Sequence, residues 1–225
     1  MLVLGVDTSG KNGSIALARL EQGTPRTVEV VALEGGTFSA QLVPEISELL
    51  QRHRLTKRNI DAFAVVSGPG SFTGLRVGLA AIKALAEILQ KPIAAVSLLE
   101  AVAQISGSEG DVLAALDAGR GEVYVAGVRT SGRRSTVRDQ HLLTFAEFVS
   151  SSGNRQIVTP DAKIGDLARE KGLRVTQVAY PRADVIARLG LEKIEAGEVI
   201  SVEALDANYI RRSDAEVKKI GEVRK

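Results

Sequence analysis

Between Ser67 and Leu89 the chain reads SGPGSFTGLRVGLAAIKALAEIL, a glycine-rich turn followed by an amphipathic run. The apolar stretch from Ile60 to Val66 comes directly before it and predicts a buried strand. A strand, a glycine turn and a helix in this order bring unpaired backbone N–H groups and the positive end of a helix dipole to one point. The segment therefore predicts a strand–turn–helix unit with the chemistry of an anion-binding loop.

The loop does not match either common phosphate-binding motif. A P-loop has four residues between its glycines and then a Lys, whereas five residues separate Gly68 from Gly74 and Leu75 follows. A dinucleotide-binding fingerprint requires glycine at the position of Thr73. Both motifs are therefore excluded, although a phosphate at the helix N-terminus stays compatible with the sequence.

The alternative is a purely architectural loop. In this interpretation the glycines give the backbone freedom, Pro69 stiffens the turn and Thr73 caps the helix. Gly78, one turn into the helix, lets another element approach closely. We favour the architectural role, for which the loop residues are Gly68, Pro69, Gly70, Thr73 and Gly74.

The rest of the chain alternates strands and helices in two rounds. In the first round, apolar periodicity predicts strands at 2–6, 14–20, 27–33, 60–66 and 93–96, and helices at 39–53, 73–89 and 98–105. After the polar linker 107–110, it predicts strands at 112–116, 122–128 and 174–178, and helices at 145–151, 161–171 and 182–196. Both rounds open with a strand, an Asp-containing turn and another strand. We therefore predict an N-terminal lobe, 1–106, and a smaller C-terminal lobe, 107–225, whose last helical segment packs back on the first lobe.

Composition excludes several classes of protein. The 225 residues are 44% hydrophobic and 25% charged, which is typical of a globular chain, and no apolar stretch is long enough to span a membrane. The absence of cysteine excludes disulfides and thiolate metal sites and is consistent with the cytoplasm. The net charge of +2 does not predict nucleic-acid binding, and the basic C-terminal tail is interpreted as solvated helix charge. That tail contains Arg211, Arg212, Lys218, Lys219, Arg224 and Lys225.

Three segments resemble one protein family. They are MLVLGVDTSGKNGSIAL at the N-terminus, GPGSFTGLRVGLAAIKALA from Gly68, and ALDAGRGEVYVA from Ala115 to Ala126; ANYIRRSDAEVK near the C-terminus adds a looser match. In this order they resemble the TsaB (YeaZ) family, bacterial proteins needed to make threonylcarbamoyladenosine next to the anticodon of tRNAs that read codons beginning with A. The resemblance implies an α/β fold of the actin-like, ribonuclease H-like superfamily, with two lobes that are each a mixed β-sheet flanked by helices.

The resemblance also implies that the chemistry belongs to another protein. The catalytic paralogue of this family, TsaD, has the pattern V-N-H-L-E-G-H, in which both histidines bind a metal. This chain reads VSLLEAV, with Leu98 and Val102 at those two positions. An alkyl group has no lone pair for a metal, and the two histidines of the chain, His53 and His141, are predicted at a helix end and in a loop. We therefore expect no metal and a noncatalytic accessory subunit.

Two turns are candidates for nucleotide binding. Asp7, Thr8 and Ser9 resemble the first phosphate turn of the actin-like superfamily, and Asp117 resembles the acid of the second turn, which orients magnesium-bound water. No glycine-rich adenosine-binding segment follows Gly153. We expect a degenerate site that holds no resident cofactor, with weak nucleotide binding left open. The alternative is that these residues only hydrogen-bond their own turns.

Three enzyme classes compete with a noncatalytic role. An aspartic protease would need a second Asp-Thr-Gly turn and a nearly all-β chain, and a serine hydrolase would need a Gly-x-Ser-x-Gly elbow. The sequence has none of these features. A small-molecule kinase or ATPase of the actin-like superfamily remains the alternative function, because it would use the two Asp turns on one ATP.

The helices at 39–53 and 73–89 are candidates for a partner surface. Small residues on the second helix permit close helix approach, and the predicted partner-binding residues are Leu79, Ala80, Lys83, Ala84 and Glu87. The alternative is that the apolar stripe only covers the sheet. The family resemblance implies a TsaD-type partner, a TsaE-type ATPase, a homodimer when the chain is alone, tRNA contact through the complex, and no membrane. Phe38 departs from the family, which usually has histidine there.

Overall fold

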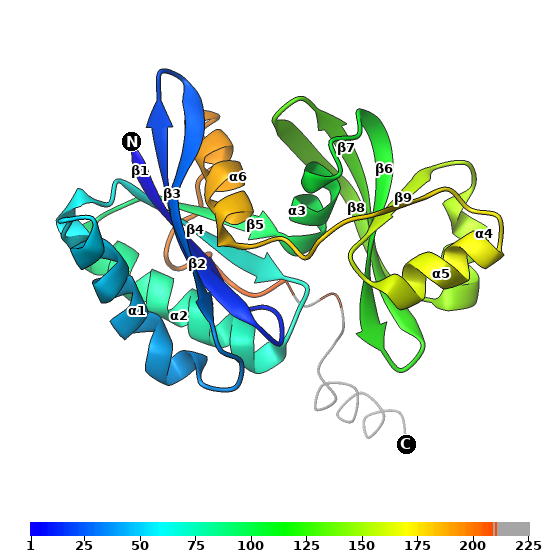
Figure 1. The fold of residues 1–225 in the computed structure, drawn as a ribbon, viewed down its shortest axis with the longest axis horizontal. Helices are drawn as coiled ribbons and strands as arrows, with labels where there is room; N and C mark the ends of the chain where they lie inside the picture. Colours follow the sequence, from blue (N-terminus) through cyan, green and yellow to red (C-terminus); the bar gives the residue numbers. More distant parts are fainter. Residues whose placement is uncertain (209, 211–225) are drawn as a thin grey trace.

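Two five-stranded sheets stand side by side, each with helices against it (Figure 1). The computed structural model describes residues 1–208 and 210. The predictions for the basic tail, and for most of the ANYIRRSDAEVK segment, lie outside these residues. No helix in the described part of the chain is both long and apolar enough to cross a membrane.

The first sheet has the strand order β3-β2-β1-β4-β5. Its strands are β1 (Leu2–Asp7), β2 (Gly13–Glu21), β3 (Thr24–Leu33), β4 (Ala62–Gly68) and β5 (Ile93–Ser97). β1, β2 and β3 form the predicted antiparallel meander, whereas β4 runs parallel to β1 and β5 parallel to β4. Helices α1 (Phe38–Arg52) and α2 (Phe72–Leu89) lie together on one face of this sheet, and the short 3₁₀ turn η1 (Lys57–Asn59) leads into β4 (Figure 1).

The second sheet repeats this topology in the order β10-β9-β6-β7-β8. Its elements are β6 (Gly110–Gly119), β7 (Glu122–Ser131), β8 (Arg134–Thr144), α4 (Phe145–Ser152), β9 (Gln156–Thr159), α5 (Ala162–Glu170) and β10 (Val175–Gln177). The meander β6-β7-β8 is again followed by a strand, β9, that runs parallel to its first strand. The repeated mixed sheets have the predicted two-lobed α/β architecture of the actin-like class.

Two strands, β8 and β9, were not predicted from the sequence. The prediction that His141 lies in a loop is therefore wrong, because His141 is paired with Val125 inside β8. Most side chains of β8 are exposed or half-buried, since β8 is the edge strand of the sheet. An edge strand that buries little apolar surface has only a weak hydrophobic pattern, and sequence periodicity cannot find it.

Two helices are exchanged between the halves of the chain. α3 (Leu98–Ile105) comes from the first half but packs mainly on β6, β7 and β8, whereas α6 (Ala183–Glu195) comes from the second half and packs on β1, β2, β4 and β5. The backbone of α6 comes so close to the first sheet that a Cβ added at Gly190 would lie 2.3 Å from Ala64 Cβ. The division at residues 106 and 107 therefore differs from the packing at α3, whereas α6, the last helix in the described part of the chain, packs on the first lobe.

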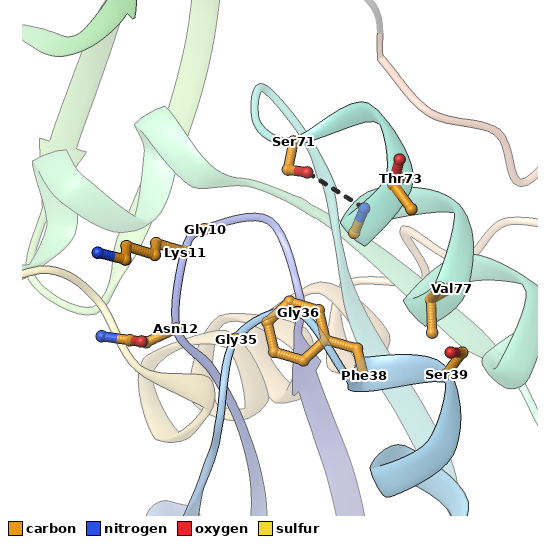
Figure 2. A pocket seen from close by; sticks show the side chains of 11 residues that line it. Gly10, Lys11, Asn12, Gly35, Gly36, Phe38, Ser39, Ser71, Thr73 and Val77 are labelled. Carbon is orange, nitrogen blue, oxygen red and sulfur yellow. Dashed lines mark hydrogen bonds between the residues drawn. The ribbon is translucent and has the colours of Figure 1, made fainter.

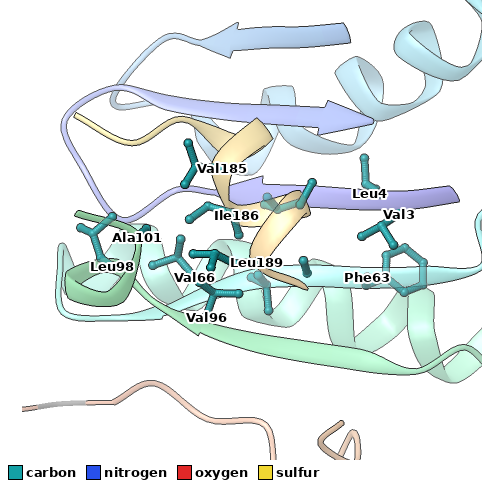
Figure 3. Close-up of a cluster of buried hydrophobic side chains, with 14 of the residues drawn as sticks. Val3, Leu4, Phe63, Val66, Val96, Leu98, Ala101, Val185, Ile186 and Leu189 are labelled. Carbon is teal, nitrogen blue, oxygen red and sulfur yellow. The ribbon is translucent and has the colours of Figure 1, made fainter. Parts of the chain in front are cut away.

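One large core joins the exchanged helices to both sheets. Ile186 and Leu189 of α6 lie among strand residues that include Val66 and Val96, and Leu98 of α3 belongs to the same cluster (Figure 3). A smaller cluster around Phe148 holds α4 and α5 on the second sheet. This arrangement holds the end of β1 at Asp7 and the end of β6 near Asp117 beside a common cleft.

Candidate functional site

The predicted loops meet at a cleft between the two sheets. A hollow of about 450 Å³ is lined by Ser9 from the first turn, Gly70 from the glycine loop and Asp117 from the second turn. Leu98, Leu116, Tyr124 and Tyr180 form much of the rest of its wall. The structure thus brings the two Asp turns and the glycine loop together at one place, as a nucleotide site of this fold class would require.

The polar side chains of the first turn are buried, and they form hydrogen bonds with neighbouring groups of the protein. Asp7 is buried, and its Oδ1 accepts hydrogen bonds from Ser9 N at 2.8 Å and Ser9 Oγ at 2.6 Å. Burial raises the pKa of Asp7, an effect that the two Ser9 bonds oppose. Thr8 is also buried, and its Oγ1 donates to the carbonyl of Gly74 at 2.7 Å. These groups stabilise the turn; Ser9 lines the cleft, whereas Asp7 and Thr8 do not.

The glycine loop lies directly on this turn. Ser71 N donates to Ser9 O at 2.7 Å. An added Cβ would lie 2.5 Å from Ser9 O at Gly70, 2.0 Å from Thr8 O at Gly74 and 2.4 Å from Thr8 Oγ1 at Gly78. Contacts this short leave no space for a side chain between α2 and the β1–β2 turn. The glycines at these three positions allow close packing of backbone on backbone.

The α2 helix begins at Phe72 and is capped by Ser71, so the cap predicted at Thr73 is wrong. The Ser71 side chain accepts a hydrogen bond from Gly74 N at 3.3 Å, which Figure 2 shows as a dashed line. Thr73 is exposed and borders an adjoining hollow of about 510 Å³, across which Lys11 and Asn12 lie opposite α2 (Figure 2). Two hydroxyl residues stand within three positions here, and only the backbone geometry decides which one caps the helix.

Ser71→Ala is expected to lower the free energy of unfolding by about 1 kcal/mol, because Gly74 N loses its acceptor at the start of α2. Thr73→Ala is the matched control and should change stability by less than about 0.5 kcal/mol. Urea denaturation followed by circular dichroism measures both variants. A larger loss for Thr73→Ala than for Ser71→Ala would contradict this assignment of the cap.

At the second turn, the carboxylate of Asp161 accepts a hydrogen bond from the backbone. Asp117 Oδ1 accepts from Gly119 N at 2.8 Å, and Asp117 N donates to Asp161 Oδ2 at 2.7 Å. The Tyr180 hydroxyl donates to the other oxygen of Asp161, and burial together with this hydrogen bond raises the pKa of Tyr180. Asp117 N and Oδ1 are thus both hydrogen-bonded within the chain. A phosphate at this turn without a cation beside it would meet two carboxylates.

Sequence reasoning missed Asp161. It lies at the start of the predicted helix 161–171 and is the N-cap residue of α5, yet its side chain makes no capping hydrogen bond. Its carboxylate reaches a residue 44 positions earlier in the chain. An Asp at a helix start normally indicates a cap, so no local signal pointed to the Asp117 turn.

The outer face of α2 carries an exposed row of residues spaced four apart, Phe72, Arg76, Ala80, Ala84 and Ile88. Ile88 is 71% exposed, and Phe72, 42% exposed, stacks under the Arg76 guanidinium at 3.7 Å. Val43 on the neighbouring α1 is 57% exposed. We call this row together with Val43 the α1–α2 surface.

The predicted partner residues only partly coincide with the α1–α2 surface. Ala80 and Ala84 belong to it, Glu87 is exposed beside it, and Lys83 is half-buried. Leu79 is buried in the core, so its prediction as a partner contact is wrong. The sequence pattern did not single out Phe72, Ile88 and Val43 as exposed apolar residues. The stronger apolar stripe, which covers the sheet, dominates the periodicity of the same helices.

Comparisons with known proteins connect this geometry to a family. The model of tRNA N6-adenosine threonylcarbamoyltransferase (TsaD) matches residues 35–204. The chain is 30% identical to the tRNA threonylcarbamoyladenosine biosynthesis protein TsaB of Bacillus subtilis, over 98% of both chains. It is 32% identical to the TsaB protein of Haemophilus influenzae, over 78% of this chain and 71% of the relative. The chain belongs to the TsaB (YeaZ) family.

Solved structures agree with this family. YeaZ from Pseudomonas aeruginosa is 25% identical, with a TM-score of 0.75 over 92% of this chain and 99% of that one. The ethanolamine utilization protein EutJ from Carboxydothermus hydrogenoformans is 12% identical, with a TM-score of 0.53 over 84% of this chain and 90% of that one. At that identity it shows a shared fold and nothing more.

The resemblance to TsaD implies metal-binding histidines at two positions of α3, and this chain has alkyl side chains at both. Leu98 and Val102 are both buried in α3 and belong to the large core. They do not fit a metal ion. His53 lies at the end of α1 and pairs with Glu29 at 2.6 Å, and His141 lies 3.6 Å from Asp139. Among residues 1–208 and 210, no group of three or more potential metal-binding side chains comes together.

Phe38, at the position where the family resemblance implies a histidine, begins α1. Its ring is buried against the first meander, where a Cβ added at Gly13 would lie 2.8 Å from Phe38 Cε1. The side chain thus fixes the start of α1 on β2 by apolar contact.

Proposed function

We propose that the chain is a noncatalytic subunit in the biosynthesis of tRNA threonylcarbamoyladenosine. The curated relatives are named for this pathway, and the matching family model is that of the transferase. In this proposal a TsaD-type protein transfers the threonylcarbamoyl group to the adenosine next to the anticodon, and the present chain supports it. The proposed setting is the cytoplasm, with tRNA contacted through the complex.

The observation that carries the noncatalytic part is the packing of the glycine loop on the Asp7 turn. The close backbone contacts of Gly70 and Gly74 with Ser9 and Thr8 give these glycines a packing role that requires no phosphate. Asp161 supports the same proposal from the other lobe, because it accepts the hydrogen bond of Asp117 N. A cleft whose loops are held by contacts within the chain can position a partner without a nucleotide.

The α1–α2 surface is the proposed contact with the TsaD-type partner. Its exposed apolar side chains lie on a rigid helix pair, and Ala80 and Ala84 leave room for close approach of another helix. The same surface would form a homodimer when the partner is missing, because an exposed apolar patch can bind a second copy of itself. A TsaE-type ATPase is the third proposed component.

Ala84→Arg is expected to weaken the complex with the TsaD-type partner at least about tenfold, because a charged side chain would be buried at the contact without a partner. The matched control is Ala146→Arg on α4, an exposed alanine of the other lobe, which should leave affinity unchanged. Isothermal titration calorimetry with the purified partner measures both. Equal affinities for the two variants would exclude this face as the contact.

Reconstitution tests the function itself. The purified chain, its TsaD-type and TsaE-type partners and unmodified tRNA should together yield threonylcarbamoyladenosine, measured by mass spectrometry of digested tRNA. Omission of the chain should abolish the product. ATP turnover by the chain alone, without a stable complex, would instead favour a small-molecule kinase or ATPase.

A further inference from the structure

The segment that follows α1 concentrates positive charge at one end of the first lobe. Residues 52–59, which lead from α1 through η1 toward β4, contain no Asp or Glu. Their exposed basic residues are Arg52, Arg54, Lys57 and Arg58. The helix dipole accounts for a cation in the last turn of α1, such as Arg52, but its effect does not extend to the three cations beyond that turn.

A pair of arginines on the first sheet extends this charge. Arg52 Nη2 lies 2.8 Å from Glu29 Oε1 on β3, so the end of α1 is held on the face of the sheet that carries Glu29. Leu17 of β2 is opposite Glu29, and Arg19, two residues farther along β2, has its side chain on the same face. Arg26 of β3 is directly opposite Arg19, and both arginines are exposed.

A second set of contacts brings the same segment to β2. Asp61 follows Arg58 by three residues, and its Oδ2 accepts from Leu2 N at 2.7 Å while its backbone N donates to Leu2 O at 2.8 Å. Leu2 is in turn opposite Arg19. The cations therefore lie on one continuous region, which we call the basic surface: Arg19, Arg26, Arg52, Arg54, Lys57 and Arg58.

Most cations of the basic surface are not neutralised within the chain. Arg26 lies 3.7 Å from Glu21, and Arg52 pairs with Glu29. In the part of the chain that the structure describes, the other four form no ion pair: Arg19, Arg54, Lys57 and Arg58. Like charges directly opposite each other on paired strands are unfavourable for folding, as at Arg19 and Arg26. The surface thus presents uncompensated positive charge to a ligand.

The backbone that carries these cations is fixed. Arg54 N donates to Gln51 O at 2.9 Å, and Thr56 N donates to Asn59 Oδ1 at 2.8 Å. Arg54 has a left-handed backbone with φ of 56°, just after the end of α1, where glycine is the favoured residue. An ordered backbone reduces the entropy that is lost when a ligand binds.

A phosphodiester backbone complements this surface better than a membrane does. Five of the six basic residues are arginines, and a guanidinium binds two phosphate oxygens at once. Binding at a lipid surface combines cations with exposed apolar side chains. Leu55 is the apolar residue of the segment 52–59, and it is half-buried against the core.

We propose that the basic surface binds the phosphodiester backbone of tRNA directly and without reading its sequence. The choice of tRNA rests on the function proposed above, whereas the polyanionic character of the ligand rests on the surface alone. The basic surface shares no residue with the α1–α2 surface. The chain would therefore hold tRNA and its TsaD-type partner at the same time.

The first test measures binding of fluorescently labelled, unmodified tRNA to the full chain by anisotropy between about 50 and 200 mM salt. Arg54→Gln combined with Arg58→Gln should weaken binding at least about tenfold and lower the slope of log affinity against log salt by about 2. The matched control is Lys163→Gln combined with Lys171→Gln, which removes the same charge from exposed positions of α5 and its C-cap. The control should leave affinity and slope unchanged.

Three results of this test would overturn the proposal. They are no binding of tRNA by the chain, equal losses in the two double variants, and tighter binding to vesicles containing phosphatidylserine than to tRNA.

Arg54→Gly separates binding from folding. Glycine adopts the left-handed backbone without strain, so the urea midpoint of the variant should not fall, whereas its affinity for tRNA should fall about fivefold through loss of one phosphate contact. A folded variant that binds tRNA as tightly as the unmodified chain would exclude Arg54 from the contact.

Reconstitution distinguishes failure of this proposal from failure of the proposed function. The Arg54→Gln and Arg58→Gln double variant should raise the KM for tRNA and leave affinity for the TsaD-type partner unchanged. An unchanged KM, with product still dependent on the chain, would reject the basic surface and retain the function. Binding of tRNA through the basic surface by a chain that is dispensable for the product would reject the function and retain the surface.

Discussion

Lys193→Met is expected to lower the free energy of unfolding by about 3–5 kcal/mol at neutral pH. Lys193 Nζ lies 3.1 Å from Oε1 of Glu100, whose residue is only 3% exposed and whose Oε1 also accepts from Ser135 Oγ at 3.1 Å. The pair joins the two exchanged helices, because Glu100 is on α3 and Lys193 is on α6. Removal of the lysine leaves a buried carboxylate without its cation. Urea denaturation at constant pH measures the loss.

The loss should depend on pH with a defined sign. Burial raises the pKa of Glu100 above its ordinary value, and Lys193 is the main group that opposes the increase. Without Lys193 the pKa of Glu100 rises further. A raised pKa in the folded state means that this group favours folding at low pH and loses that contribution as the pH rises through the folded-state pKa. The deficit of Lys193→Met should therefore be smallest near pH 4, below the unfolded pKa of Glu of about 4.3, and should grow toward neutral pH.

A second substitution separates the charge from the packing. Glu100→Gln combined with Lys193→Met removes both charges, so the double variant should be more stable than Lys193→Met alone at neutral pH. A deficit that is the same at acidic and neutral pH, or a double variant as unstable as the single one, would show that lost packing of the lysine stem is the cause instead.

Gly74→Ala is expected to destabilise the chain by about 3 kcal/mol. The new Cβ would lie 2.0 Å from the carbonyl oxygen of Thr8, and a backbone atom in a buried turn cannot move away easily. In an unconstrained helix the same change would stabilise by up to about 1 kcal/mol, so the expected sign is itself informative. Thermal and urea denaturation measure the change.

The matched control is Gly165→Ala in α5. There the nearest atom to the new Cβ is Oε1 of Gln177 at 2.4 Å, the mobile end of a flexible side chain. This variant should be close to the unmodified chain in stability, because Gln177 can rotate away. If Gly74→Ala were equally stable, the close contact of α2 with the β1–β2 turn would not be what requires glycine there.

Much of the fold was predictable because its buried elements have clear periodicity. The helix predicted at 98–105 matches α3, and the helices predicted at 39–53 and 182–196 each differ from α1 and α6 by one residue at either end. β8 was missed because an edge strand buries few side chains, and β9 because it has only four residues. The packing of α3 on the second sheet was not predictable, since an amphipathic stripe shows that a helix covers a sheet but not which one.

The candidate site shows the same limit at the level of single residues. The resemblance indicated phosphate-type turns at Asp7 and Asp117, and the structure brings these turns and the glycine loop to one cleft. It did not distinguish a loop that surrounds a phosphate from one that packs on a neighbouring turn, because both require glycine where atoms come close. The role of Gly74 became clear only from its neighbour Thr8, which lies 66 positions away in the chain.

The exchange of α3 and α6 makes the two halves of the polypeptide thermodynamically interdependent. In either half taken alone, the apolar face of one sheet would be exposed to water, and one amphipathic helix would have no sheet to pack against. Loss of structure in one half therefore removes a cover from the other, so the halves are expected to unfold as one cooperative unit and not in separate transitions.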